Sequence, residues 1–116
     1  MKVQLHGQHL RLRIDESELA ALRAGAALEN VTVVGARAWR QVLRQGSAAG
    51  APTLLVDANE CAITIPRALI DTYAGRLPCR EGLVVSIRAA EGSVLEVALE
   101  VDVRDSVRAR GPHRKP

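Results

Sequence analysis

Two segments decide the fold, RLRIDESELAAL at residues 11–22 and AITIPRALIDTY at residues 62–73. In each segment an alternating apolar run, typical of a half-buried strand, leads into a short helical stripe. Asp15, followed three residues later by Glu18, predicts a capping box at the start of the first helix. Pro66 suits the first position of the second helix, where its missing N–H would have been unpaired in any case. Both segments are therefore expected to be strand–helix units.

Further strand patterns lie on both sides of these two units, bounded by turn residues. Residues 36–45 fit either a helix or a strand, because Trp39 lies on an apolar face in both interpretations. The expected helices are residues 16–24 and the segment from Pro66 to Gly75, and the expected strands are residues 2–6, 9–14, 31–34, 53–57, 61–65, 82–88 and 94–103. If residues 36–45 are a strand, the order is ββαββ, a linker, and ββαββ.

The two strand–helix segments overlay at an offset of 51 residues, which places Ile14 on Ile65. This match predicts an internal duplication in one α+β domain, residues 1–103. The halves would be residues 1–45 and 53–103, joined by the linker 46–52. One half alone would leave its apolar face open, so we expect a pseudo-two-fold barrel or sandwich of short strands with two flanking helices.

Composition favours one cytoplasmic domain with an aliphatic core. The chain has 116 residues, 47% of them hydrophobic but only 2% aromatic, so Leu, Val, Ile and Ala must fill the interior. No run is long and apolar enough for a membrane span or a secretory signal, and no membrane partner is expected. Cys61 and Cys79 stand alone, which indicates reduced thiols in a cytosolic protein.

The positive charge is concentrated at the C-terminal end. Residues 104–116 hold five of the 16 basic residues and one of the 13 acidic residues, so the rest of the chain has a net charge of −1. A basic C-terminal tail is most often solvated, and we expect the fold not to depend on it. Weak nucleic-acid binding would use this tail and the outward arginines of residues 9–14. The candidates are Arg11, Arg13, Arg108, Arg110, Arg114 and Lys115.

No pattern for catalysis, a cofactor or a metal stands out. His6 and His9 flank the first hairpin turn, and Asp57 and Glu60 occupy the matching positions 51 residues later. Polar residues beside a turn are the default for solvation, and this spacing is not a zinc signature. Neither cysteine has an evident base nearby, and the glycines form no phosphate-binding loop. We therefore predict no catalytic residue, no cofactor and no bound metal.

The opening MKVQLHGQHLRLRIDESELAAL and the later ITIPRALIDTYAG resemble a family of small bacterial proteins known only as a domain of unknown function. This resemblance implies a bacterial origin and a compact fold, and no activity. A second, local resemblance joins ITIPRALID and CREGLVVSIR to AbrB-like swapped-hairpin DNA-binding domains, including antitoxins. Glu60 precedes this motif where those domains carry a basic residue, and Leu83 follows Gly82 where they carry Asp.

These observations favour a non-enzymatic binding or regulatory module over an enzyme. A homo-oligomer is plausible because an open sheet edge favours pairing. The alternative is an AbrB-like DNA-binding transcriptional regulator or antitoxin. The nearly neutral body argues against it, as does the lack of aromatic residues on which single-stranded bases could stack.

Overall fold

The computed structural model describes residues 1–112. The first half of the chain forms β1 (Lys2–His6), β2 (His9–Ile14), α1 (Glu16–Arg23), β3 (Leu28–Val34) and β4 (Arg37–Gly46). The second half forms β5 (Thr53–Val56), β6 (Glu60–Pro66), α2 (Arg67–Arg76), β7 (Leu83–Arg88) and β8 (Val94–Val101), and α3 (Val103–Arg110) follows. The predicted order ββαββ–linker–ββαββ is confirmed.

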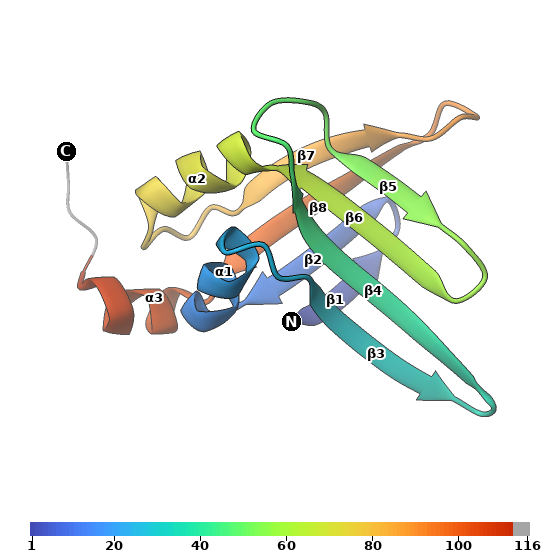
Figure 1. Cartoon of the computed structure of the whole chain (residues 1–116), viewed down its shortest axis with the longest axis horizontal. Coiled ribbons are helices and arrows are strands. Elements are labelled where there is room, and N and C mark those ends of the chain that lie inside the picture. Colours follow the sequence, from blue (N-terminus) through green and yellow to red (C-terminus); the bar gives the residue numbers. More distant parts are fainter. Residues whose placement is uncertain (113–116) are drawn as a thin grey trace.

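The strands form two four-stranded sheets, and each half of the chain contributes one hairpin to each sheet. The first sheet has the order β1-β2-β8-β7 and the second has the order β3-β4-β6-β5. Hairpins pair antiparallel, but the two halves meet through parallel pairs, β2 with β8 and β4 with β6. Neither half has a sheet of its own, because the chain crosses to the other sheet after each helix (Figure 1). The α+β class and the similar halves are confirmed, and of the two architectures expected, barrel or sandwich, the two sheets do not form a closed barrel.

Both sheets and helices α1 and α2 share one aliphatic core. Leu12 of the first sheet and Leu43 of the second are completely buried in it, as is Leu22 of α1. Tyr73 of α2 places its ring in this core and accepts a 2.8 Å hydrogen bond from the backbone N–H of Val101. The low aromatic content therefore has the expected consequence, a core made almost entirely of aliphatic side chains.

Residues 37–46 are a strand, which decides between the two interpretations of this segment. Leu43 faces the core, and Val42 on the opposite face is also fully buried. A strand covered on both faces at its centre does not show a simple alternation of apolar and polar residues. That double burial explains why the sequence pattern also fitted a helix.

The two main helices begin in different ways. Asp15 accepts a hydrogen bond from the backbone N–H of Glu18, and Glu18 accepts one from the backbone N–H of Asp15, so the predicted capping box is present. Pro66 is the last residue of β6 and not the first residue of α2. The linker takes over the capping role, because the carbonyl groups of Ser47 and Ala48 accept hydrogen bonds from the first two N–H groups of α2.

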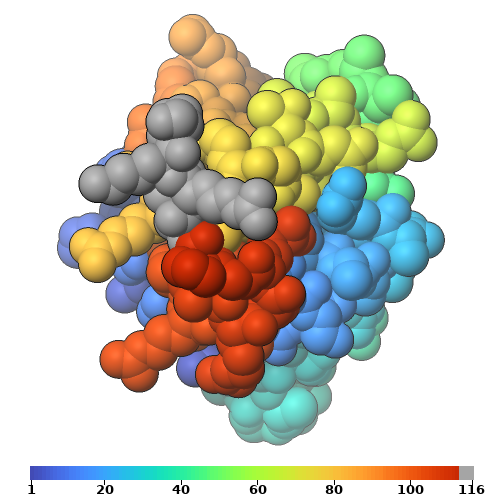
Figure 2. Space-filling model, turned by 90° about the vertical axis from the view of Figure 1, so that its left-hand side faces the viewer, coloured from blue at the N-terminus to red at the C-terminus, as the bar shows by residue number. Residues whose placement is uncertain are grey.

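The C-terminal segment differs from the sequence prediction. Strand β8 ends at Val101, and most of the predicted tail is helix α3, which packs beside α1 (Figure 2). Asp102 caps this helix, and Ser106 within it is completely buried. The interpretation of residues 104–110 as a solvated end is wrong, because this segment is a helix in which Asp105, Ser106 and Arg110 bond to Glu16 of α1. The predicted contacts Arg114 and Lys115 lie outside the described residues.

Candidate functional site

The two hairpin turns singled out in the sequence occupy equivalent places at the ends of the two sheets. His6 pairs directly with His9 across the turn between β1 and β2. In the turn between β5 and β6, Asp57 Oδ1 accepts 2.9 Å hydrogen bonds from the backbone N–H groups of Asn59 and Glu60. Asp57 therefore acts as a turn-stabilising residue, and the offset of 51 residues holds for both hairpins.

Beside the two turns, the acidic residue and its basic-type neighbour exchange places between the equivalent strands. His9 of β2 lies next to Glu96 of β8, with 3.4 Å between His9 Nδ1 and Glu96 Oε2. At the matching place, Glu60 of β6 lies next to Arg40 of β4, with 3.9 Å between Arg40 Nη1 and Glu60 Oε1. Thus the acid lies on β8 in one sheet and on β6 in the other. No group of three or more His, Cys, Asp or Glu in residues 1–112 is arranged to hold a metal ion.

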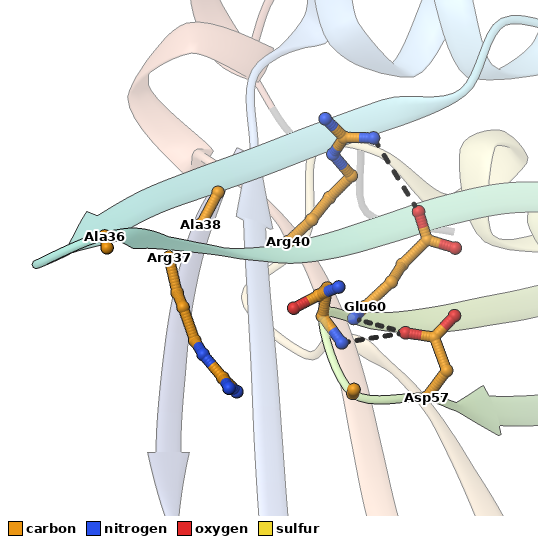
Figure 3. A pocket seen from close by; sticks show the side chains of 8 residues that line it. Ala36, Arg37, Ala38, Arg40, Asp57 and Glu60 are labelled. Atoms are coloured by element: carbon orange, nitrogen blue, oxygen red, sulfur yellow. Dashed lines mark hydrogen bonds and ion pairs between the residues drawn. The ribbon is translucent and has the colours of Figure 1, made fainter.

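An open groove of about 670 Å³ lies at the hairpin ends of the second sheet (Figure 3). Arg40 and Glu60 line one side, and Arg37 points away from both of them. Arg37 makes no ion pair with any residue of the described chain 1–112, so its guanidinium is free to donate two hydrogen bonds to an external carboxylate. Asp57, Asn59 and three alanines complete the lining of the groove.

Among the predicted nucleic-acid contacts on β2, Arg11 is engaged by a carboxylate. Arg11 donates two hydrogen bonds to Glu100, of 2.6 and 2.9 Å. Hydrogen bonding and charge from Glu100 raise the pKa of Arg11, and Arg11 in turn lowers the pKa of Glu100. Arg13, on the same strand face, adds a smaller lowering of the pKa of Glu100. Phosphate binding by Arg11 would therefore have to displace an existing partner.

The arginines of α3 are also bonded within the chain. Arg110 Nη2 lies 3.0 Å from Glu16 Oε1, and Arg110 Nη1 donates to the carbonyl oxygen of Ala74. Burial alone would raise the pKa of Glu16, but hydrogen bonds from Arg110 and Ser106 outweigh it and lower that pKa. Arg108 is more exposed, with 3.8 Å to Asp105. Of the predicted contacts in α3, only Arg108 presents its charge mainly to solvent.

Neither cysteine has the environment of an activated nucleophile. Cys61 is half-buried in β6, and burial and the neighbouring Glu60 both raise the pKa of its thiol. A raised pKa reduces the thiolate fraction on which cysteine nucleophilicity depends. Cys79 lies in the loop after α2, where its Sγ donates a 3.0 Å hydrogen bond to the carbonyl oxygen of Glu81.

An exposed apolar edge strand is the feature that sequence reasoning missed. Strand β3 is an edge of the second sheet, and three of its side chains, Val31, Val33 and Val34, are exposed. We call these three residues the valine edge. Val33 exposes 72% of its surface, and the hairpin of β3 and β4 extends away from the helices (Figure 1). The run of β-branched residues was recognised as a strand, but its place at a sheet edge could not be inferred before the pairing was known.

Residues 1–107 match a family of unknown function, DUF7009. The chain belongs to this family. The match confirms the resemblance to a domain of unknown function and gives no support to the AbrB-like resemblance. No curated protein shows significant similarity to the chain. No solved structure does so either.

No helix within residues 1–112 of this DUF7009 member has the length and hydrophobicity to cross a membrane. The family match extends through β8 and into α3, so it covers both sheets and the first turn of the last helix. The valine edge and the groove at Arg37 thus lie within the matched region.

Proposed function

We propose that this protein is a non-enzymatic binding module that recognises an extended protein strand by adding it to the second sheet along β3. The single observation that carries the proposal is the valine edge, the three exposed valines Val31, Val33 and Val34 on a strand whose outer edge is unpaired within residues 1–112. An edge strand presents a row of free N–H and C=O groups, and proteins normally protect such an edge with charge, proline or a covering segment. Recognition by strand addition uses these backbone groups for affinity and adjacent side chains for specificity.

Three further aspects belong to the same proposal. The protein works in a bacterial cytoplasm, which is supported by two unpaired cysteines suited to a reducing compartment. Its halves arose by duplication, which is supported by the equivalent turns and parallel pairs in the two sheets. DNA binding ranks second, because Arg11 and Arg110 already have carboxylate partners.

In-cell photo-crosslinking tests the proposed function. A photo-reactive amino acid replaces Val33 in one variant and Val84 in a matched control. Val84 is also an exposed valine on an edge strand, but it lies on β7 of the first sheet. We expect a protein adduct from position 33 that is absent from position 84. Equal adducts from both positions, or none from position 33, would show that β3 is not a recognition edge.

A further inference from the structure

Strands β3 and β7 are outer strands at equivalent ends of the two sheets, but they differ in their protection. Leu28 of β3 pairs with Leu43, and Leu83 of β7 pairs with Leu99, so these two pairs are equivalent. Counting along each strand from this anchor, Val31 corresponds to Ser86 and Val33 corresponds to Arg88. Thus β7 carries a hydroxyl and a positive charge where β3 carries two exposed valines.

A charge on an edge strand prevents pairing with another strand, because pairing would desolvate the charge or bring it beside a like charge. Arg88 therefore protects β7. Strand β3 lacks such protection although it is longer, with seven residues against six. Only one residue of β3 is charged, Glu29 near its beginning, and Glu29 lies 4.0 Å from Arg40 of the neighbouring strand.

The same charge pattern indicates which strand can occupy this edge. When a strand pairs antiparallel with its own copy, residues near the centre meet their equivalents, so a central charge would repel itself. In β3 the centre is uncharged, and the one acid lies away from it and already has a basic neighbour. Strand β7 is also uncharged at its centre, but it ends in Arg88, which makes no ion pair within residues 1–112, so β3 is the better candidate for pairing with its own copy.

We propose that the strand added to β3 is β3 of a second copy, so that the protein is a symmetric dimer whose second sheets join edge to edge. The proposal rests on the proposed function and specifies its partner. A two-fold axis near Thr32 places Val31 opposite Val33 of the second copy, and the reverse, on the outer face of the joined sheet. This arrangement is isologous, and the Glu29 carboxylates of the two copies lie toward opposite ends of the paired segment.

Light scattering after size-exclusion chromatography tests the dimer. The wild-type protein is expected at twice the 12.5 kDa mass of one chain. The variant Val33→Arg gives β3 the residue type that protects β7, and we expect it at the mass of one chain. The matched control Val84→Arg adds the same charge to the outer face of β7 and should keep the dimer mass. Circular dichroism confirms that both variants fold.

A second measurement keeps the proposal testable if Val33→Arg fails to fold. In the wild-type protein, amide hydrogen exchange in residues 29–34 should slow as the chain concentration increases, whereas exchange in β7 should not change. A dimer that has not formed at a chain concentration of about 0.5 mM has a dissociation constant too weak to be useful. A wild-type protein that is still monomeric at this concentration would therefore contradict the dimer. A Val33→Arg variant that remains dimeric would also overturn it.

The crosslinking experiment separates this proposal from the proposed function. An adduct at position 33 with the mass of two identical chains supports both. An adduct with a different protein retains strand recognition by β3 but contradicts the dimer. No adduct contradicts the proposed function itself.

Discussion

Arg110 and Glu16 lie 94 residues apart in the sequence and form an ion pair that joins the last helix to the first. The backbone N–H of Glu16 also donates a 2.7 Å hydrogen bond to Asp105, so α3 satisfies one of the free donors at the start of α1. Ser106 donates a further 2.7 Å hydrogen bond to the Glu16 carboxylate. Helix α3 is therefore part of the folded unit.

Truncation after Val103 is expected to destabilise the protein. It removes the hydrogen bonds that Asp105, Ser106 and Arg110 of α3 make with Glu16, and water takes their place. Each hydrogen bond exchanged for one with water costs about 0.5–1.5 kcal/mol of stability. Urea denaturation followed by circular dichroism measures the change. Arg108→Ala is the control, because this exposed side chain makes only a 3.8 Å pair and should change stability by less than about 0.5 kcal/mol.

Tyr73→Phe tests the buried hydrogen bond between α2 and β8. The hydroxyl of Tyr73 is the acceptor for the Val101 N–H, and the ring is almost completely buried. Its loss leaves a buried backbone donor unpaired, which costs about 1–3 kcal/mol. We expect the urea midpoint to fall accordingly. The control Thr72→Ala removes a hydroxyl on the exposed side of the same helix, and an equal loss in both variants would contradict this explanation.

Alanine substitutions at two glycines are expected to have opposite effects on stability, one through overpacking and the other through helix propensity. A Cβ on Gly82 would lie 2.8 Å from the carbonyl oxygen of Leu99, so Gly82→Ala must displace β8 backbone. Overpacking of this kind typically costs about 1–3 kcal/mol. A Cβ on Gly75, within α2, meets no atom within 4 Å, so Gly75→Ala should stabilise the protein by about 0.5–1 kcal/mol. If the thermal unfolding midpoints of both variants shifted in the same direction, this explanation would be wrong.

The strand–helix units could be predicted because local chemistry specifies them. Asp15 and Glu18 define a helix start through two reciprocal hydrogen bonds, which a sequence shows directly. Strand β8 alternates apolar and charged residues because one face packs and the other is solvated. By contrast, β3 begins three residues earlier than predicted, because Glu29 and Asn30 resemble a loop until their pairing with β4 is known.

Helix α3 could not be predicted from apolar periodicity because its buried residue is a serine. The segment contains only two large apolar residues, Val103 and Val107, and Val107 remains partly exposed. Its attachment to α1 depends on hydrogen bonds to Glu16, a partner far away in sequence. The difference in protection between edge strands β3 and β7 could not be predicted either, because it depends on which strands pair with one another across long stretches of sequence.

The Arg11–Glu100 pair predicts a specific pH dependence of stability. Arg11 lowers the pKa of Glu100 from its ordinary value of 4.5, so the folded state binds this proton less readily than the unfolded state. The stabilisation is therefore complete above pH 4.5 and is lost as the pH falls through the lower folded-state pKa. Urea midpoints measured between neutral and acidic pH should show a smaller acid-induced loss for Glu100→Gln than for the wild type. Arg37→Ala, which removes an arginine without an ion pair in residues 1–112, should show the same acid-induced fall in the urea midpoint as the wild type.

Any affinity for DNA should come from the basic residues near the C-terminus and should be weak. Phosphate binding needs free positive charge that releases counterions, whereas Arg11 and Arg110 are held by Glu100 and Glu16. A variant with Arg108, Arg114 and Lys115 all changed to Ala keeps the contacts of α3 with Glu16, unlike a truncation.

Fluorescence anisotropy with a labelled duplex of about 20 base pairs should give wild-type dissociation constants no tighter than the micromolar range near 0.15 M salt. The triple variant should bind still more weakly, with a shallower dependence on salt, since each lost phosphate contact reduces that slope by about one. Arg11→Ala serves as the matched control and should change little, because its guanidinium is already engaged. Nanomolar binding near physiological salt, or a loss of binding in Arg11→Ala that exceeds the loss in the triple variant, would instead place a DNA contact on β2 and favour a DNA-binding regulator.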